Sequence, residues 1–171
     1  MSERPEETAV AEAGADTAPQ VSILAQYVKD LSFENPNAPQ SLQNAAGAQP
    51  RIEVNVNVGV RRVAEDAYEV DLRVDATARH EALKAFQVEL LYSGVFGLKN
   101  VPEEALEPFL LVEAPRMLFP FARRIVADAT RDGGFPPLLL DPIDFAALYM
   151  QQRGQANGAT PDLSGDVAGN A

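Results

Sequence analysis

The residue types that carry enzyme chemistry form no recognisable catalytic pattern in this chain, although carboxylates are plentiful. The sequence contains no cysteine and one histidine, His80, which stands among charged residues. Adjacent carboxylates such as Glu65 and Asp66 are typical of loops and helix starts, where they favour solubility and complement the helix dipole. The motifs G-x-G-x-x-G, G-x-x-x-x-G-K-[ST] and H-E-x-x-H are all absent. We therefore predict no catalytic residue, no metal ligand, no cofactor and no enzymatic activity.

Apolar side chains instead gather in two loops, where polar residues would normally meet water. The segment FENPNAP begins with Phe33 and is followed by Leu42, and the segment FPPLLLDP begins with Phe135 and holds an apolar run that ends at Leu140. Prolines keep both segments out of regular helix. Such residues either cap the core of a single chain or line a groove for an extended polypeptide, and composition alone leaves both interpretations open.

Composition limits the size of the folded unit and the kinds of partner. At 171 residues, of which 46% are hydrophobic and 23% charged, the chain suits one domain with a packed core. Its formal net charge of -11 repels nucleic acid and anionic membrane surfaces, so we expect neither as a partner. The lack of cysteine, of a secretion signal and of a long apolar run predicts a cytoplasmic protein that does not insert into a membrane.

Composition also separates the ends of the chain from its middle. Residues 1–19 are acidic and contain no aromatic side chain, and residues 154–171 are rich in Gly, Ala and Asn. Neither stretch can bury enough apolar surface to offset the entropy that is lost on folding. We predict a disordered acidic arm over residues 1–19, a folded domain over residues 20–153 and a disordered tail over residues 154–171.

Four stretches of this domain alternate apolar and polar residues with the period of a β-strand. They lie in residues 20–35, 52–61, 68–77 and 86–92, and the last ends at Ser93 and Gly94. Short connections between the last three predict an antiparallel meander. In the first stretch, residues of one parity are apolar and those of the other parity are polar; the two sets are Ile23, Ala25, Tyr27, Leu31 and Phe33, and Asp30, Ser32 and Glu34.

The chain changes period after residue 100, as expected for helices. Apolar residues after Met117 recur with helical spacing, and Gly133 ends the pattern. Prolines within residues 103–120 leave the continuity of an earlier helix open. A short terminal helix is predicted downstream, with Asp141 as its N-cap and fraying near Arg153. Strands followed by helices predict the α+β class.

The strand at residues 86–92 carries apolar side chains on both parities, which a sheet covered on one side by helices does not require. One parity holds Phe86, Val88, Leu90 and Tyr92, while Leu91 lies on the other. Packing of a second copy would bury the extra face. We therefore predict a homo-oligomer in which these four residues belong to the interface.

Several segments resemble the SecB family of protein-export chaperones. They are YVKDLSFENPNAP at residues 27–39, DAYEVDLRVDATA at 66–78, MLFPFAR at 117–123 and GGFPPLLLDPIDFAALYM at 133–150. The resemblance covers roughly residues 20–153. It implies an antiparallel sheet of four strands with helices on one face, assembling as a homotetramer that is a dimer of dimers. It also implies ATP-independent holding of unfolded precursor proteins in the cytoplasm and their delivery to the SecA translocation ATPase.

The resemblance also indicates which residues meet each partner. For SecA it points to acidic strand positions that match Asp30, Glu34 and Glu89, of which the first two share a strand face by their spacing. For unfolded clients we expect a groove, chosen from the apolarity of loops and helix faces as well as from the resemblance. Its expected lining is Tyr27, Phe33, Leu42, Phe96, Phe135, Leu138, Leu140, Phe145 and Tyr149.

A second interpretation keeps the acidic oligomer but makes it an adaptor dedicated to one client. The two functions differ in promiscuity. A general holding chaperone protects several unrelated denatured proteins from aggregation, whereas a dedicated adaptor protects only one.

Overall fold

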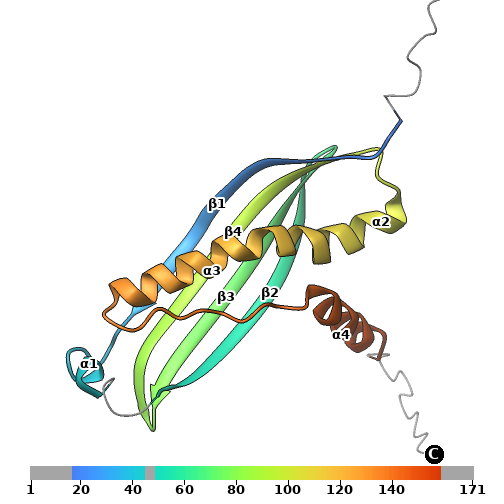
Figure 1. Cartoon of the computed structure of the whole chain (residues 1–171). Helices are drawn as coiled ribbons and strands as arrows, with labels where there is room; N and C mark the ends of the chain where they lie inside the picture. The colour runs from blue at the N-terminus through green and yellow to red at the C-terminus, as the bar shows by residue number, and fades with distance from the viewer. Residues whose placement is uncertain (1–16, 45–48, 159–171) are drawn as a thin grey trace, which may run out of the picture.

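A single antiparallel sheet forms the body of the molecule. The computed structural model describes residues 17–44 and 49–158. The sheet has four strands in the order β1-β4-β3-β2, so that β1 and β2 form its two edges (Figure 1). The strands are β1 (Gln20–Glu34), β2 (Arg51–Ala64), β3 (Ala67–His80) and β4 (Leu83–Lys99). The predicted α+β fold, with a sheet covered on one face, is confirmed.

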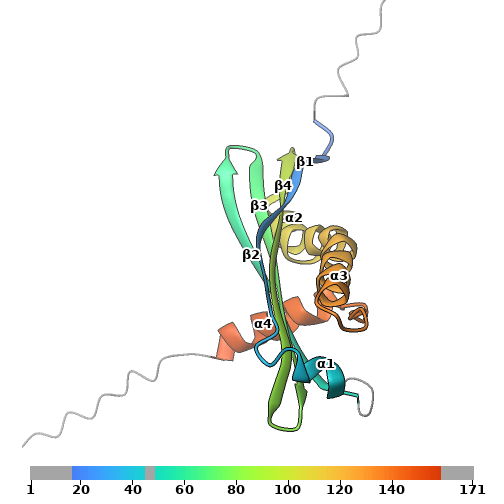
Figure 2. The ribbon, with the colours of Figure 1, turned by 90° about the vertical axis from the view of Figure 1, so that its left-hand side faces the viewer.

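The main helices lie on one side of this sheet. Figure 2 views the sheet along its edge, with α2 and α3 on the same side of the strands. The helical elements are α1 (Gln40–Asn44), α2 (Glu103–Pro108), the π-helical turn η1 (Phe109–Glu113), α3 (Ala114–Asp132) and α4 (Phe145–Gly158). Within the described residues, no helix combines the length and apolarity that crossing a membrane requires.

Alternation along the strands places the core on the helix-covered face. In β3 the side chains from Val70 to Ala78 on this face are fully buried, and they are neighbours of the buried residues of β4. The other face, which we call the open face, carries the odd-numbered residues of β4 from Gln87 to Val95 and their cross-strand partners. It is mainly polar, as expected for a sheet that leaves one face uncovered.

The first strand departs from simple alternation. Register shifts between Ile23 and Ala25 and between Val28 and Asp30 mark two β-bulges, each of which inserts one residue and reverses the parity. Ala25 and Tyr27 therefore face the same side as Asp30, and the predicted set that joined them to Ile23, Leu31 and Phe33 is wrong. A bulge cannot be read from residue types, because it depends on the partner strand.

The fourth strand is longer than predicted and continues through Gly94 to Lys99. Gly94 lies on the helix-covered face, where a β-carbon would come within 2.8 Å of Leu118 in α3 and 3.0 Å of Phe96. Here glycine does not end the strand but lets the helix approach it closely.

The four residues expected at an oligomer interface lie in the core of the single chain. They are Phe86, Val88, Leu90 and Tyr92, and all of them are buried on the helix-covered face. Their burial needs no second copy, which corrects the expectation drawn from this strand. The extra apolar residue on its other parity, Leu91, is only half-buried and lies on the open face.

The helical region is one continuous run from Glu103 to Asp132. Pro108 ends α2, a π-helical turn follows, and α3 begins at Ala114. Proline has no backbone N–H to donate to the helix. The π-turn changes the local hydrogen-bond spacing, which lets the helix continue past Pro108.

The last helix is capped by a different residue from the one predicted. The backbone N–H of Ala147 donates to the carboxylate of Asp144 at 3.0 Å, so Asp144, not Asp141, serves as the cap. The helix also runs past Arg153 to Gly158, beyond the predicted domain boundary. The rest of the predicted tail, and the predicted arm up to residue 16, lie outside the described residues.

Candidate functional site

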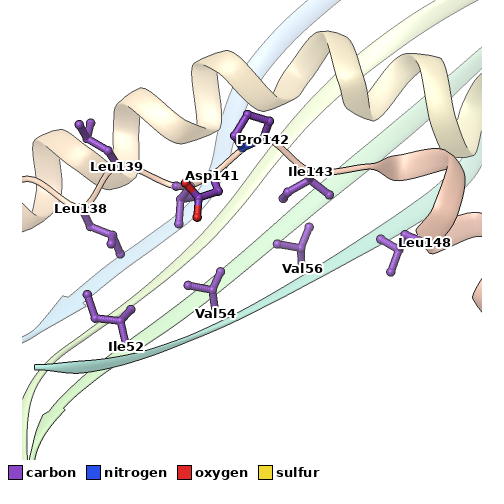
Figure 3. A pocket seen from close by; sticks show the side chains of 10 residues that line it. Ile52, Val54, Val56, Leu138, Leu139, Asp141, Pro142, Ile143 and Leu148 are labelled. Atoms are coloured by element: carbon purple, nitrogen blue, oxygen red, sulfur yellow. The ribbon is translucent and has the colours of Figure 1, made fainter.

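An apolar cleft separates the edge strand β2 from the chain that leads to the last helix. We call the chain from Phe135 to Asp144 the crossing segment; it contains neither helix nor strand. The cleft, which we call the β2 cleft, has a volume of about 490 Å³. Its lining comes from both walls: Ile52, Val54 and Val56 of β2, residues 138–143 of the crossing segment, and Leu148 of α4. In Figure 3 the side chains of Leu138 and Ile143 point across the cleft toward β2.

The β2 wall is apolar because of its alternation. Ile52, Val54 and Val56 lie on the helix-covered face, opposite buried residues of β3. Despite facing the helix-covered side, Ile52 remains 39% exposed and Val54 42% exposed. Exposed β-branched side chains in this number on an edge strand are unusual for a surface that only meets water.

The opposite wall is kept extended by its prolines and fixed by its larger side chains. Pro136, Pro137 and Pro142 prevent a regular helix. Phe135 and Leu140 are buried, so they anchor the segment to the core. Between them, Leu138 stays half-buried in the cleft.

Aromatic rings form a second apolar cluster at the start of the crossing segment. The ring of Phe135 lies 4.9 Å from that of Phe86 and 6.4 Å from that of Phe33, measured between ring centres. Leu42 of α1 lies beside Gly134, close to this cluster, and is 38% exposed. The structure thus brings together Phe33, Leu42 and Phe135, three of the expected client residues, and Phe135 is mostly buried.

The remaining predicted client residues lie in different places. Phe96 and Phe145 are buried in the core, where they contact Phe109 and Phe119. Tyr27 lies on the open face, and its hydroxyl donates to Glu69. Of the predicted set, only Leu138 and Leu140 line the β2 cleft.

Most residues of the cleft lie outside the client-binding set expected from the sequence. The missed residues are Ile52, Val54, Val56, Leu139, Asp141, Pro142, Ile143 and Leu148. The stripe on β2 was recognisable as one face of a strand. The exposure of this stripe could not be predicted from the sequence, because the order of the strands and the position of the helices decide which strand stays uncovered.

The open face carries the acidic positions expected to meet SecA. Asp30 and Glu34 are partners of Leu91 and Gln87 of β4, and Ser32 is the partner of Glu89, so all three carboxylates point to this face. Asp30 and Glu34 are exposed, while Glu89 is half-buried and accepts a hydrogen bond from Gln87 at 3.1 Å. The second bulge of β1 is what brings the three carboxylates to one face.

A fourth carboxylate lies directly beside this group. Asp75 of β3 is the cross-strand partner of Glu89. One of its oxygens is buried with no hydrogen-bond partner among the described residues. Burial, with a smaller contribution from Glu89, raises the pKa of Asp75, although Arg73 opposes this shift. Asp75 and Glu89 are carboxylates placed opposite each other, a pairing that destabilises a sheet when both are charged. Together they concentrate negative potential at this place on the open face.

Elsewhere on the open face a carboxylate is fully partnered. The side chain of Glu69 is only 7% exposed and binds Lys29 at 2.6 Å and Arg61 at 2.9 Å, in addition to Tyr27. These hydrogen bonds, with that of Lys29 the largest effect, lower the pKa of Glu69 to about 2. The cluster joins β1, β2 and β3 across the sheet.

The chain matches known proteins over most of its length. The model of the family described as preprotein translocase subunit SecB matches residues 14–156. The protein-export protein SecB of Zymomonas mobilis is 60% identical over 143 residues, which are 84% of this chain and 86% of that protein. That of Rhizorhabdus wittichii is 58% identical over 153 residues, which are 88% of this chain and 91% of that protein. The chain belongs to the SecB family.

The same fold is found in a more distant chaperone. A SecB-like chaperone of Mycobacterium tuberculosis, solved in complex with a ChAD peptide from an antitoxin, matches with a TM-score of 0.60. The match covers 72% of this chain and 90% of that chain at 17% sequence identity. At this identity, the similarity shows a shared SecB-like fold.

The Glu69 cluster makes the stability of this SecB-family chain depend on pH. Because its folded pKa is below the usual value of 4.5, ionised Glu69 stabilises the fold above that pH, and this stabilisation is lost as the pH falls toward 2. We expect Glu69→Gln to lower the free energy of unfolding at neutral pH by about 1 to 2 kcal/mol. Between about pH 5 and pH 3, the variant should lose less stability than the wild type.

Urea unfolding at a fixed protein concentration measures both effects. Glu53→Gln is the control, because Glu53 is an exposed open-face glutamate whose ion pair with Arg51 spans 3.5 Å. Equal pH dependence in the wild type and both variants would contradict the role given to Glu69.

Proposed function

We propose that this SecB-family chain is an ATP-independent chaperone of the cytoplasm that holds unfolded precursor proteins for export and delivers them to the SecA translocation ATPase. The observation that carries the proposal is the apolar β2 cleft, which is open to solvent along an edge strand. The curated relatives are named for protein export, which supports the same function for this chain.

The walls of the cleft suit a chain that has not folded. Residues two apart on a strand are separated by about 7 Å, the same spacing as alternate side chains of an extended polypeptide. The stripe of Ile52, Val54 and Val56 therefore matches an extended apolar segment without requiring a particular sequence. The outer edge of β2 also offers backbone groups to pair with such a segment.

Binding in this cleft rests on many small contacts. Each square ångström of apolar surface removed from water contributes about 25 cal/mol, so binding accumulates along the length of a client. The distant SecB-like chaperone was solved in complex with a peptide, which supports a polypeptide ligand for this chain.

The β2 wall is tested by Val54→Ser. Val60 provides the control, because it lies on the same face of β2 with a similar exposure, 39% against 42%, but outside the cleft. We expect Val54→Ser to weaken binding of an unfolded protein about three- to tenfold and Val60→Ser to leave it unchanged.

Suppression of aggregation and fluorescence anisotropy with several unrelated denatured proteins measure this binding. Protection of only one of them by the wild type would favour the dedicated adaptor. Equal losses in both variants would show that the cleft is not the client site.

Self-assembly is proposed from a different surface. The edge strand β1 exposes Val21, Ile23, Val28 and Leu31 on the helix-covered side, and α3 exposes Met117 and Phe121. An exposed apolar edge strand is a ready template for pairing with another chain. We place the contact between copies here, as a homotetramer that is a dimer of dimers.

Native mass measurement at micromolar concentration should give about four times 18.4 kDa. Val28→Lys, which puts a charge on the exposed edge, should shift the protein toward smaller species. Val60→Lys makes the same change on β2 and should leave the mass unaltered. A folded wild type that remains monomeric would refute the assembly.

SecA docking is proposed on the acidic part of the open face. Asp30, Glu34 and Glu89 offer a flat negative surface, and Asp75, one of whose oxygens has no hydrogen-bond partner among the described residues, lies next to it. Two cations of the same face, Lys29 and Arg61, are already held by Glu69. Arg73 lies on this face too, as the cross-strand partner of Leu91, but Asp30, Glu34, Glu89 and Asp75 outnumber it, which suits the region to a basic segment.

Glu34→Lys and Glu89→Lys should each lower SecA affinity and make its dependence on salt shallower, because exposed charges act through screened attraction. Client binding should persist, since the cleft is on the other side of the sheet. Glu103→Lys, at the start of α2, is the control with the same charge change. If a triple reversal that includes Asp30→Lys binds SecA as the wild type does, with the same salt dependence, the site is wrong.

A further inference from the structure

The β2 cleft stays open although both of its walls are apolar. Ile52 and Val54 leave much of their surface exposed, and Leu138 and Ile143 face them across the gap (Figure 3). The hydrophobic effect favours closing such a gap, because closure would remove both walls from water. Besides the buried Phe135 and Leu140, other contacts must therefore hold the crossing segment away from β2.

The crossing segment is fastened to α3. The backbone N–H of Leu138 donates to the hydroxyl of Thr130 at 2.9 Å, and the Nε of Arg123 donates to the carbonyl of Leu140 at 2.7 Å. In the described parts of the chain, residues 17–44 and 49–158, no hydrogen bond joins this segment to β2. A backbone bond from the N–H of Phe135 to the carbonyl of Thr130, at 3.1 Å, holds the start of the segment. The two side-chain bonds hold the backbone on the helix side farther along, at residues on either side of Leu139.

Thr130 is suited to this task by its burial. It is fully buried in α3, where a β-branched polar residue is a poor helix former. Its hydroxyl lies 3.0 Å from the carbonyls of Val126 and Ala127, to which it donates. Because the proton is used there, the oxygen remains free to accept from Leu138.

We propose that Arg123 and Thr130 are positioning residues that keep the β2 cleft open by fastening the crossing segment to α3. The inference rests on the proposed client-binding function, and it explains how the cleft stays open before a client binds. Neither residue needs to touch the client. They act by keeping Leu138 and Ile143 apart from Ile52 and Val54.

This role has a kinetic signature. If the segment closes on β2 for part of the time, the apparent affinity for a client falls by the fraction of molecules that remain open. The loss appears in the association rate, because the open form still makes the same contacts once the client is bound. Closure would also hide apolar surface, so binding of an apolar dye should decrease.

The first variant is Arg123→Met, which keeps an unbranched apolar stem and removes the donor to Leu140. Arg124→Met is its matched control, because Arg124 is the next residue of the same helix and contacts Asp128 at 3.6 Å instead of the crossing segment. The second pair is Thr130→Ser, which keeps the oxygen, and Thr130→Val, which removes it. The full-length chain is used throughout, after its assembled mass is shown to equal that of the wild type.

We expect Arg123→Met and Thr130→Val to slow association of an unfolded model protein about three- to tenfold with little change in its dissociation rate. Both should bind less 8-anilinonaphthalene-1-sulfonate than the wild type. Arg124→Met and Thr130→Ser should behave as the wild type in both measurements.

Three results would overturn the inference, and each is distinguishable from the others. If the wild type binds clients but Arg123→Met and Thr130→Val associate as fast as it does, the fastening has no role in the site. If these variants bind more dye and lose stability, the two residues only support the fold. If the wild type itself holds no unfolded protein, the proposed function fails, and the positioning role fails with it.

Discussion

Alternation along four strands confines nearly all of the core to one face of one sheet, and the remaining surfaces follow from this constraint. A chain of this length supplies one layer of helices, so it covers one face and leaves the other face and both edges of the sheet exposed. The three exposed surfaces differ in chemistry. The open face is polar and acidic at one end, the β1 edge carries an apolar row, and the β2 edge forms one wall of a cleft. Different partners could therefore bind to different surfaces of the molecule and need not compete for one pocket.

The open face requires polar groups that do not weaken the sheet. Glu69 meets this requirement, because its buried carboxylate is bound by residues of β1 and β2 and holds the edge strands to the centre. Lys29, the residue inserted by the second bulge, is one of its partners. The same bulge turns Phe33 toward the core and Glu34 toward solvent. One local irregularity thus sets the chemistry of both faces of β1.

Sequence periodicity predicted the strands, the long helix and their class, because burial on one face fixes the residue types at each position. It did not predict the bulges of β1 or the extension of β4 beyond Gly94, since both depend on what packs opposite. The site shows the same division. Leu138 and Leu140 were recognisable because apolar residues in a proline-rich segment are unusual, whereas Ile52 and Val54 read as ordinary strand residues. Only the strand order reveals that β2 is an uncovered edge.

A rigid cleft is compatible with binding many sequences. Affinity for an extended chain falls when the site must first open or order itself, and a promiscuous site has few specific contacts to offset that cost. Prolines reduce the freedom of the crossing segment, and its buried Phe135 and Leu140 fix both ends of the apolar run. Selectivity then comes from the client, because only a chain that is unfolded presents apolar side chains with the spacing of a strand. A folded protein hides those side chains, so in the proposed function the cleft releases a client once it has folded or been withdrawn.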